Sequence, residues 1–182
     1  MGRWANRVVT LNVATPVPRN LRNQTKEQSE ATYEALKLIG GMAKKGRVLL
    51  YESDEVLLER LNFRPATLSG TEFDTFQGVP HQRARAPLTR TFVIDWRYTP
   101  EAARASWHEF LSRIKHPRFL KLLKATGGSH AADLYHLWEA EHNGLEYFIT
   151  LDRKFVNAVT RPKPLDTPVK ICTPEQFVQA LS

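Results

Sequence analysis

The chain has very little cysteine, since Cys172 is the only one in 182 residues. A single thiol cannot form an internal disulfide bond, and it cannot build the zinc clusters that need several cysteines. A reducing compartment is therefore the expected environment, and we place the protein in the cytoplasm. The sequence also lacks a run of about 20 apolar residues and the apolar core of a secretory leader, so neither a membrane span nor export is expected.

Several motifs of catalysis are also missing. The chain contains no H-E-x-x-H zinc motif, no Walker phosphate-binding loop, no G-x-G-x-x-G dinucleotide motif and no Ser-His-Asp grouping. The six histidines are scattered, and although His130 and His136 lie near Asp133, we favour positions on a helix surface for both. Zinc hydrolases, nucleotide-triphosphate enzymes and dinucleotide enzymes therefore lose support.

What the chain does contain fits one globular domain with a basic surface. The length corresponds to a single domain, 1–182, and 42% hydrophobic residues are enough to form a core. Lysine and arginine number 26 against 19 acidic residues, which gives a formal charge of +7. Such a balance favours an anionic partner, and nucleic acid is the main candidate.

Short apolar runs alternate with amphipathic segments along the chain. Strands are expected at about 8–13, 47–51, 145–152 and 168–172, and helices are expected to begin near residues 25, 53, 100, 117, 129 and 173. The stretch 62–97 contains prolines and glycines without a sustained period, so it is interpreted as an irregular insertion. This alternation predicts an α/β fold in which helices cover both faces of a parallel sheet.

Parallel sheets place ligand sites beyond the carboxyl ends of their strands, and polar residues occur at those places here. They are Asn12, the segment 52–59 and Asp152. Thr150 lies two positions before Asp152, so its hydroxyl leaves the strand on the same side as the carboxylate. Asp133 lies in the first turn of an expected helix, where a carboxylate is favoured in any case. Taken one at a time, each acid fits a structural role.

Together, the motifs resemble those of the PIN-domain family of nucleases. The stretch HAADLYHLWEAEHNGLEYFITLDRKF is similar to that family's distal signature, in which an acidic residue opens a helix and an apolar strand ends in Thr-x-Asp. SDEVLLERL resembles the segment that carries the second acidic residue, here Glu59, and PVKICTPEQFVQAL resembles the closing strand and helix. The resemblance implies a three-layer α/β/α architecture with a central parallel sheet.

One position departs from the family's pattern. The first strand of PIN domains normally ends in an Asp that binds metal, whereas this sequence reads VTLNVATPV and has Asn12 at that place. An amide oxygen can coordinate Mg²⁺, but the change removes one negative charge from a site that depends on carboxylates. Weaker metal binding, a naturally inactive protein and a residue changed in order to inactivate it are all open interpretations of Asn12.

The chemistry that the resemblance implies is metal-dependent hydrolysis of RNA phosphodiester bonds. Asn12, Glu59, Asp133 and Asp152 would hold one or two Mg²⁺ or Mn²⁺ ions, which lower the pKa of bound water and stabilise charge on the phosphate. Thr150 would orient water or a carboxylate. The alternative is that Thr150 has no role at the site and is present because threonine favours β-strands. The resemblance thus implies an endoribonuclease that uses metal-bound water and needs no nucleophilic side chain.

The resemblance also implies partners. It suggests the toxin of a VapBC-type toxin–antitoxin pair, with RNA as substrate, a small antitoxin protein as partner and a homodimer as the assembly. A catalytically silent PIN-like module that binds RNA or a protein is the main alternative, and a structure-specific DNA nuclease is a third. Replacing Asn12 by Asp would separate the first two, because a substituted enzyme gains activity and a binding module does not.

Basic residues are unevenly distributed and suggest an RNA-binding surface. The expected RNA contacts are Arg83, Arg85, Arg90, Arg118 and Lys121. The stretch 113–124 contains no acidic residue, and its alternative role is an ordinary solvated helix face. Trp96, Tyr98 and Trp107 could stack on unpaired bases, although large aromatics more often belong to the core.

Overall fold

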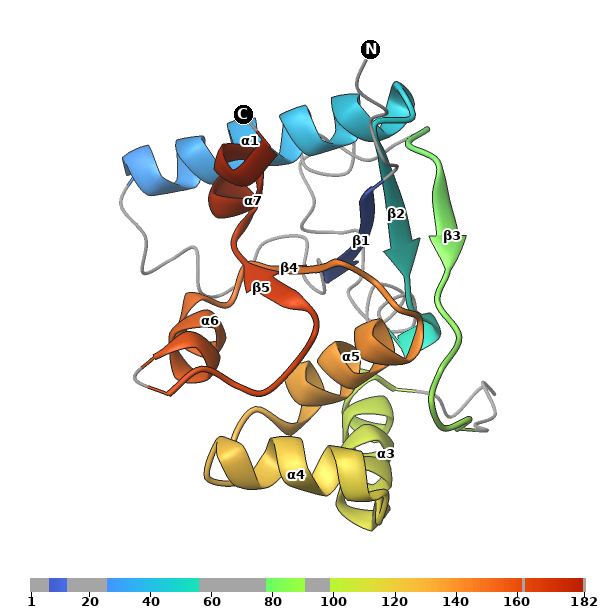
Figure 1. The fold of residues 1–182 in the computed structure, drawn as a ribbon. Helices are drawn as coiled ribbons and strands as arrows, with labels where there is room; N and C mark the ends of the chain where they lie inside the picture. Colours follow the sequence, from blue (N-terminus) through green and yellow to red (C-terminus); the bar gives the residue numbers. More distant parts are fainter. Residues whose placement is uncertain (1–6, 13–25, 56–77, 91–98, 162, 182) are drawn as a thin grey trace.

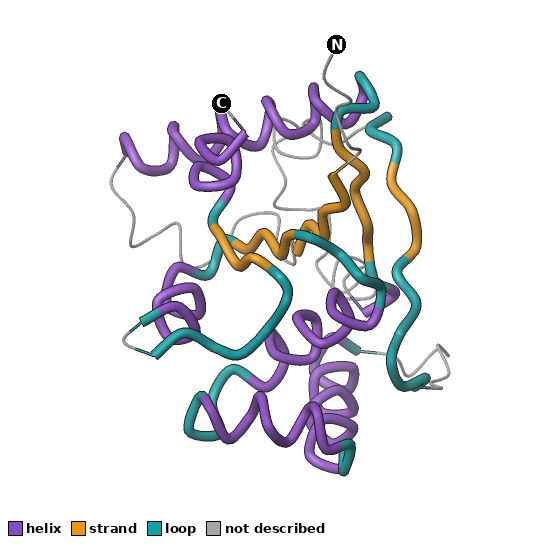
Figure 2. Tube along the Cα trace, viewed as in Figure 1, coloured by secondary structure: helices purple, strands orange, loops and turns teal. Residues whose placement is uncertain are grey.

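The computed structural model describes residues 7–12, 26–55, 78–90, 99–161 and 163–181 (Figure 2). The elements with defined bounds are, in chain order, β1 (Arg7–Asn12), α1 (Lys26–Lys44), β2 (Val48–Glu52), β3 (His81–Arg83), α3 (Pro100–Arg113), α4 (Pro117–Ala125), α5 (Ala131–His142), β4 (Tyr147–Thr150), α6 (Arg153–Thr160), β5 (Lys170–Cys172) and α7 (Pro174–Leu181). None of the helices in these ranges combines the length and apolar composition of a bilayer span.

The described strands form one sheet in the order β3-β2-β1-β4-β5, and every neighbouring pair is parallel. In the centre of the sheet Asn12 of β1 lies opposite Thr150 of β4. The mixed α/β class predicted from the alternating pattern is thus confirmed. Because all strands are parallel, their carboxyl ends lie along a common edge.

Two apolar clusters pack against the strands, and β4 contributes to both. Tyr147 and Ile149 belong to a cluster with Ile39 of α1 and Phe177 of α7, whereas Phe148 belongs to a second cluster built largely from α3, α4, α5 and α6. Figure 1 shows α1 and α7 on one side of the strands and α3, α4 and α5 on the other. A strand that is buried in this way carries a continuous apolar run, which explains the pattern YFIT.

Several predicted helix boundaries are confirmed. Thr99 caps α3, since its hydroxyl accepts a hydrogen bond from the Ala102 N–H at 3.1 Å. Thr173 caps α7: its hydroxyl accepts a hydrogen bond from the Gln176 N–H at 3.4 Å, and its own N–H donates to Gln176 Oε1 at 2.9 Å. Gly144 follows α5 with a φ of 62°, a left-handed conformation that glycine adopts without strain.

The prediction of an irregular insertion at 62–97 missed a strand. Residues 81–83 form β3, which pairs with β2 at the edge of the sheet. All three residues, His81, Gln82 and Arg83, are exposed, so no apolar alternation marks them in the sequence. Backbone pairing with β2 forms this strand. Most of the other residues in 62–97 lie outside the described part of the chain.

Three further local predictions need correction. The helix expected to begin at Ser129 begins one position later, with His130 as its N-terminal flanking residue, and the Ser129 hydroxyl bonds to Thr126 O instead. Glycine has a low helix propensity and is expected to weaken the first helix, yet Gly40 and Gly41 lie inside α1. Helix α6 was not predicted, because Arg153–Thr160 is short and follows directly on Asp152.

Candidate functional site

Residues that follow β2 and β4 meet the first two turns of α5. Beyond β4, Asp152 follows two positions after Thr150, and Asp133 and His136 extend from α5 toward Asp152 and Ser53 respectively. Ser53 directly follows β2. The crossing of α5 over this edge therefore brings together residues that are far apart in the sequence.

Asp152 is fixed by hydrogen bonds to the backbone of α6. Its Oδ1 accepts N–H bonds from Lys154 at 2.8 Å and from Phe155 at 3.0 Å, which makes Asp152 the N-cap of this helix. Its own N–H donates to the hydroxyl of Thr150 at 3.1 Å, and Thr150 is buried. One carboxylate oxygen is thus committed to the helix, and Thr150 orients the backbone rather than the carboxylate.

Three side chains converge in front of this cap. His130, Asp133 and Asp152 each offer one ligand atom, and these three atoms all lie within 4.8 Å of one another. The His130 Nδ1 lies 3.8 Å from Asp133 Oδ2, and the His130 ring packs against Phe155 with centroids 5.5 Å apart. His130 adopts a φ of 60°, which is uncommon for a residue other than glycine.

The surroundings of Asp133 disfavour its charged form. Burial raises the pKa of its carboxyl group above the usual value, and the negative charge of Asp152 raises it further, whereas His136 and His130 oppose the shift. A carboxylate that is both buried and beside another carboxylate is disfavoured as an anion. A cation bound between the two would relieve this repulsion.

The donor set fits a divalent metal ion. Two carboxylates and an imidazole, from the N-terminal ends of α5 and α6, can supply two oxygen ligands and one nitrogen ligand to a single ion. Carboxylate oxygens suit Mg²⁺ and Mn²⁺, and an imidazole shifts the preference of a site toward transition metals such as Mn²⁺. His130 was expected on a helix surface, and its i, i+3 spacing from Asp133 was the sequence signal for a role at this site.

A second polar group lies deeper, and it corrects the prediction of a helix-surface position for His136, which is buried. His136 Nδ1 lies 3.5 Å from the Ser53 hydroxyl and 3.5 Å from Glu139 Oε2, and all three residues are buried. His136 follows Asp133 by three positions and Glu139 follows by six, so the three side chains form one stripe along α5. The stripe connects the candidate metal ligands with the end of β2.

Asn12 and Glu59 are the remaining predicted site residues, and the structure describes only the backbone of Asn12. Asn12 lies at the end of β1, in register with Thr150 and therefore at the same sheet edge as Asp152. Its backbone position fits the role that the resemblance gives it. Glu59 lies outside the described residues, so its role stays a prediction.

Two of the predicted RNA contacts lie in ion pairs that are largely shielded from solvent. Arg90 binds both carboxylate oxygens of Glu55, at 3.0 and 2.6 Å, with side-chain exposures of 9% and 11%. Arg118 makes a similar two-point pair with Glu141 and also donates to Asp166 O at 2.7 Å. We therefore interpret Arg90 as a structural residue, because its guanidinium group is buried away from solvent.

The other three predicted contacts are exposed. Arg83 pairs with Asp54 on the surface, and Lys121 pairs with Asp166 at 2.6 Å. Arg85 is held by its backbone N–H, which donates to Asn143 Oδ1 at 2.9 Å. Pairs in full contact with water are weak, so these cations can exchange their partners for phosphates. Trp107, by contrast, belongs to the core, and Trp96 and Tyr98 lie outside the described ranges.

Comparison of the chain with protein-family models, with curated proteins and with solved structures finds no match.

Proposed function

We propose that the chain is a PIN-like, metal-dependent endoribonuclease with a three-layer α/β/α architecture. The observation that carries this proposal is the meeting of Asp133, Asp152 and His130 at the carboxyl edge of a parallel sheet. The distal motif from which the resemblance was drawn contains all three residues. The surplus of positive charge supports an anionic polymer as substrate.

In this proposal Asp133, Asp152 and His130 hold Mg²⁺ or Mn²⁺, with Asn12 and Glu59 as further candidate ligands. The bound ion would supply a water molecule of lowered pKa and stabilise charge on the phosphate. The helix α6 keeps the Asp152 carboxylate in one orientation through the two N–H bonds to its Oδ1. Asp133 is half-buried, and its reduced contact with bulk water strengthens its electrostatic interaction with a cation.

A toxin of a toxin–antitoxin pair is the biological role that the resemblance favours. This role implies a small antitoxin protein as partner, a homodimer as the assembly and a cytoplasmic location. These parts of the proposal depend on the resemblance of the motifs, and the cleavage of RNA can be tested without them.

The second candidate is a catalytically silent module that binds RNA or a protein. Asn12 favours it, because this neutral residue lies at the sheet edge next to the strand that leads to Asp152. In that case the remaining carboxylates would bind metal too weakly, or in the wrong position, to cut a phosphodiester. Asn12→Asp distinguishes the two, since a large gain in cleavage indicates an enzyme and continued silence indicates a binding module.

The decisive experiment measures cleavage of single-stranded and structured RNA by purified protein with Mn²⁺, Mg²⁺ or EDTA. We expect metal-dependent cleavage that falls roughly hundredfold or more in Asp152→Asn, because the charge on the metal site is worth several kcal/mol. Asparagine caps helices as well as aspartate does, so this variant keeps α6 intact. Cleavage that persists in EDTA or in Asp152→Asn would contradict the proposal.

Metal binding gives a readout that does not depend on cleavage. Titration calorimetry with Mn²⁺ should show an affinity about tenfold or more lower in His130→Gly, because even residues that only orient metal ligands are worth about 10–100-fold. Glycine adopts the left-handed conformation of this position without strain. His108→Ala, on the exposed surface of α3, is the control and should bind Mn²⁺ like the wild type. Equal affinities in all three proteins would remove His130 from the site.

A further inference from the structure

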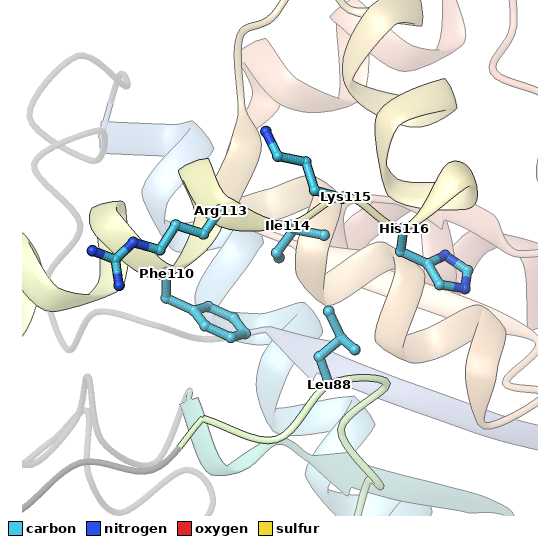
Figure 3. A pocket seen from close by; sticks show the side chains of 6 residues that line it. All are labelled: Leu88, Phe110, Arg113, Ile114, Lys115 and His116. Carbon is cyan, nitrogen blue, oxygen red and sulfur yellow. The ribbon is translucent and has the colours of Figure 1, made fainter.

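A pocket lies at the junction of α3 and α4, away from the candidate metal ligands. Its volume is about 330 Å³, and its lining residues are Leu88, Phe110, Arg113, Ile114, Lys115 and His116. Figure 3 shows Leu88, Phe110 and Ile114 pointing toward one another, while Arg113 and Lys115 extend outward. The pocket therefore has an apolar floor and a cationic rim, and none of its lining residues is acidic.

Phe110 offers an aromatic face to this pocket. Its ring stacks on Trp107, with centroids 5.5 Å apart and an interplanar angle of 15°, so Trp107 covers one face of the ring. Tyr135 packs against Phe110 edge to face at 74°. These two contacts hold the ring rigidly, which lowers the entropy cost of binding a flat ligand against it.

The rim carries positive charge next to this ring. Lys115 is exposed, and Arg113 is also exposed, although it pairs with Glu109 one helical turn earlier. The rim belongs to the stretch 113–124, which contains no acidic residue. A ligand that fits must therefore combine a flat apolar group with a neighbouring negative charge, which is the composition of an unpaired nucleotide in an RNA strand.

We propose that this pocket binds one unpaired base of single-stranded RNA, with the base on Phe110 and its phosphate at Lys115 and Arg113. The choice of RNA rests on the proposed function, and the pocket would be a subsite for a nucleotide farther along the strand from the cleaved bond. His116 of the pocket stacks on Trp138 of α5, with ring centroids 4.6 Å apart. Trp138 lies five residues after Asp133, which corresponds to about 7–8 Å along the helix.

The test measures binding of a short, fluorescently labelled oligoadenylate to the full chain by anisotropy, in EDTA and in the Asp152→Asn background, so that no cleavage interferes. Phe110→Leu keeps an apolar side chain but removes the ring, and we expect about tenfold weaker binding, because base stacking on an aromatic residue contributes that much or more. Phe110→Trp should restore binding. Lys115→Gln should weaken binding and make the log-log salt slope less negative by about 0.7.

Matched controls separate a site from general charge or misfolding. Lys44→Gln removes one exposed cation from α1, on the other side of the strands, and should leave the affinity nearly unchanged. Thermal unfolding of Phe110→Leu checks that the variant is folded, and the same oligonucleotide annealed to its complement should bind more weakly, since paired bases cannot stack on Phe110. Equal binding of single-stranded and duplex RNA, or unchanged affinity in folded Phe110→Leu and in Lys115→Gln, would overturn the proposal.

The outcome is distinguishable from the outcome for the nuclease. RNA binding that depends on Phe110 without metal-dependent cleavage would support the pocket and contradict the endoribonuclease. Suppose instead that substitutions of Phe110 and Lys115 leave the cleavage of RNA strands of every tested length unchanged. That result would support the nuclease and overturn the pocket. Preferential binding of an acidic, apolar peptide over oligoadenylate would also overturn it, and would indicate a protein partner at this surface.

Discussion

Asp152 shows how one residue can serve the fold and the site at once. Its Oδ1 is used by the backbone N–H groups of Lys154 and Phe155, and its other oxygen makes neither of these bonds. The helix holds the carboxylate in place before any ligand arrives, so little orientation is lost on binding. A structural cap and a metal ligand are therefore compatible interpretations of the same side chain.

Arg90 illustrates the opposite case, in which a basic residue serves the fold. We predict that Arg90→Ala lowers the free energy of unfolding by about 3–5 kcal/mol, because it leaves the buried Glu55 carboxylate without its cation. Part of the loss also comes from the contact of Arg90 with the Trp107 ring, 5.2 Å from the centroid. Urea denaturation followed by circular dichroism measures the change.

Arg85→Ala is the matched control for this prediction. Arg85 is exposed, and its hydrogen bonds with Asn143 use backbone atoms only, so the substitution should change stability by no more than about 0.5 kcal/mol. Similar losses of stability in both variants would show that the Arg90–Glu55 pair has no special structural role.

At the scale of the elements, Glu175 connects three helices. It lies in the first turn of α7, receives a hydrogen bond from the Thr32 hydroxyl of α1 and pairs with Arg153 of α6 at 2.8 Å. Burial alone would raise the pKa of Glu175, but hydrogen bonds from Thr173 and Thr32, with the charge of Arg153, outweigh it and lower the pKa below its usual 4.5. The folded protein thus favours the ionised form.

The sign of this shift predicts the pH dependence of stability. Because the folded pKa is lower than the unfolded one, the contribution of Glu175 is complete above about pH 4.5 and disappears as the pH falls through the folded value. Glu175→Gln should therefore lower the melting temperature at pH 7, and the difference from wild type should shrink on acidification below pH 4.5. Calorimetric melts across this range measure it, and a difference that stays constant with pH would refute the assignment.

The sequence predicted those elements whose signals are local. Continuous apolar runs located β1, β2, β4 and β5, and the caps Thr99 and Thr173 located the starts of α3 and α7. It missed β3 because an exposed edge strand of three residues is formed by pairing with β2, which no local pattern records. It missed α6 because nothing in eight residues separates an N-cap aspartate from the polar end of a strand.

The candidate site follows the same rule: residues with a local signal were predicted, and contacts between distant residues were not. Asp133 and Asp152 were named from the distal motif, and the structure brings their ligand atoms within 4.8 Å. His130 was weighed as a surface residue, since the position of its side chain depends on the left-handed backbone at the start of α5. The Ser53–His136 contact joins residues 83 positions apart, and such contacts follow from topology rather than from spacing.

At the scale of the whole molecule, the net charge of +7 is divided between cations that hold the fold together and cations that face solvent. Arg90 belongs to the first group, and Arg118 is largely engaged with Glu141. Arg83, Arg85 and Lys121 belong to the second group. Only the second group can contact phosphates, and so release counterions, without breaking ion pairs to buried carboxylates. The formal charge therefore overstates the number of cations available to RNA.

This division predicts how RNA binding responds to salt. In EDTA and in the Asp152→Asn background, the log of the binding constant should fall linearly with the log of salt concentration, by roughly 0.7 for each phosphate contact on a single strand. Replacing Arg83, Arg85 and Lys121 together by glutamine should make the slope less negative by about 2, if each residue contacts one phosphate.

Replacing Lys37, Lys44 and Lys45, which lie in or directly after α1, removes the same charge from another part of the molecule and should leave the slope close to that of the wild type. Equal changes of slope in the two triple variants would mean that RNA responds to the net charge alone, and the three predicted contacts would lose their assignment.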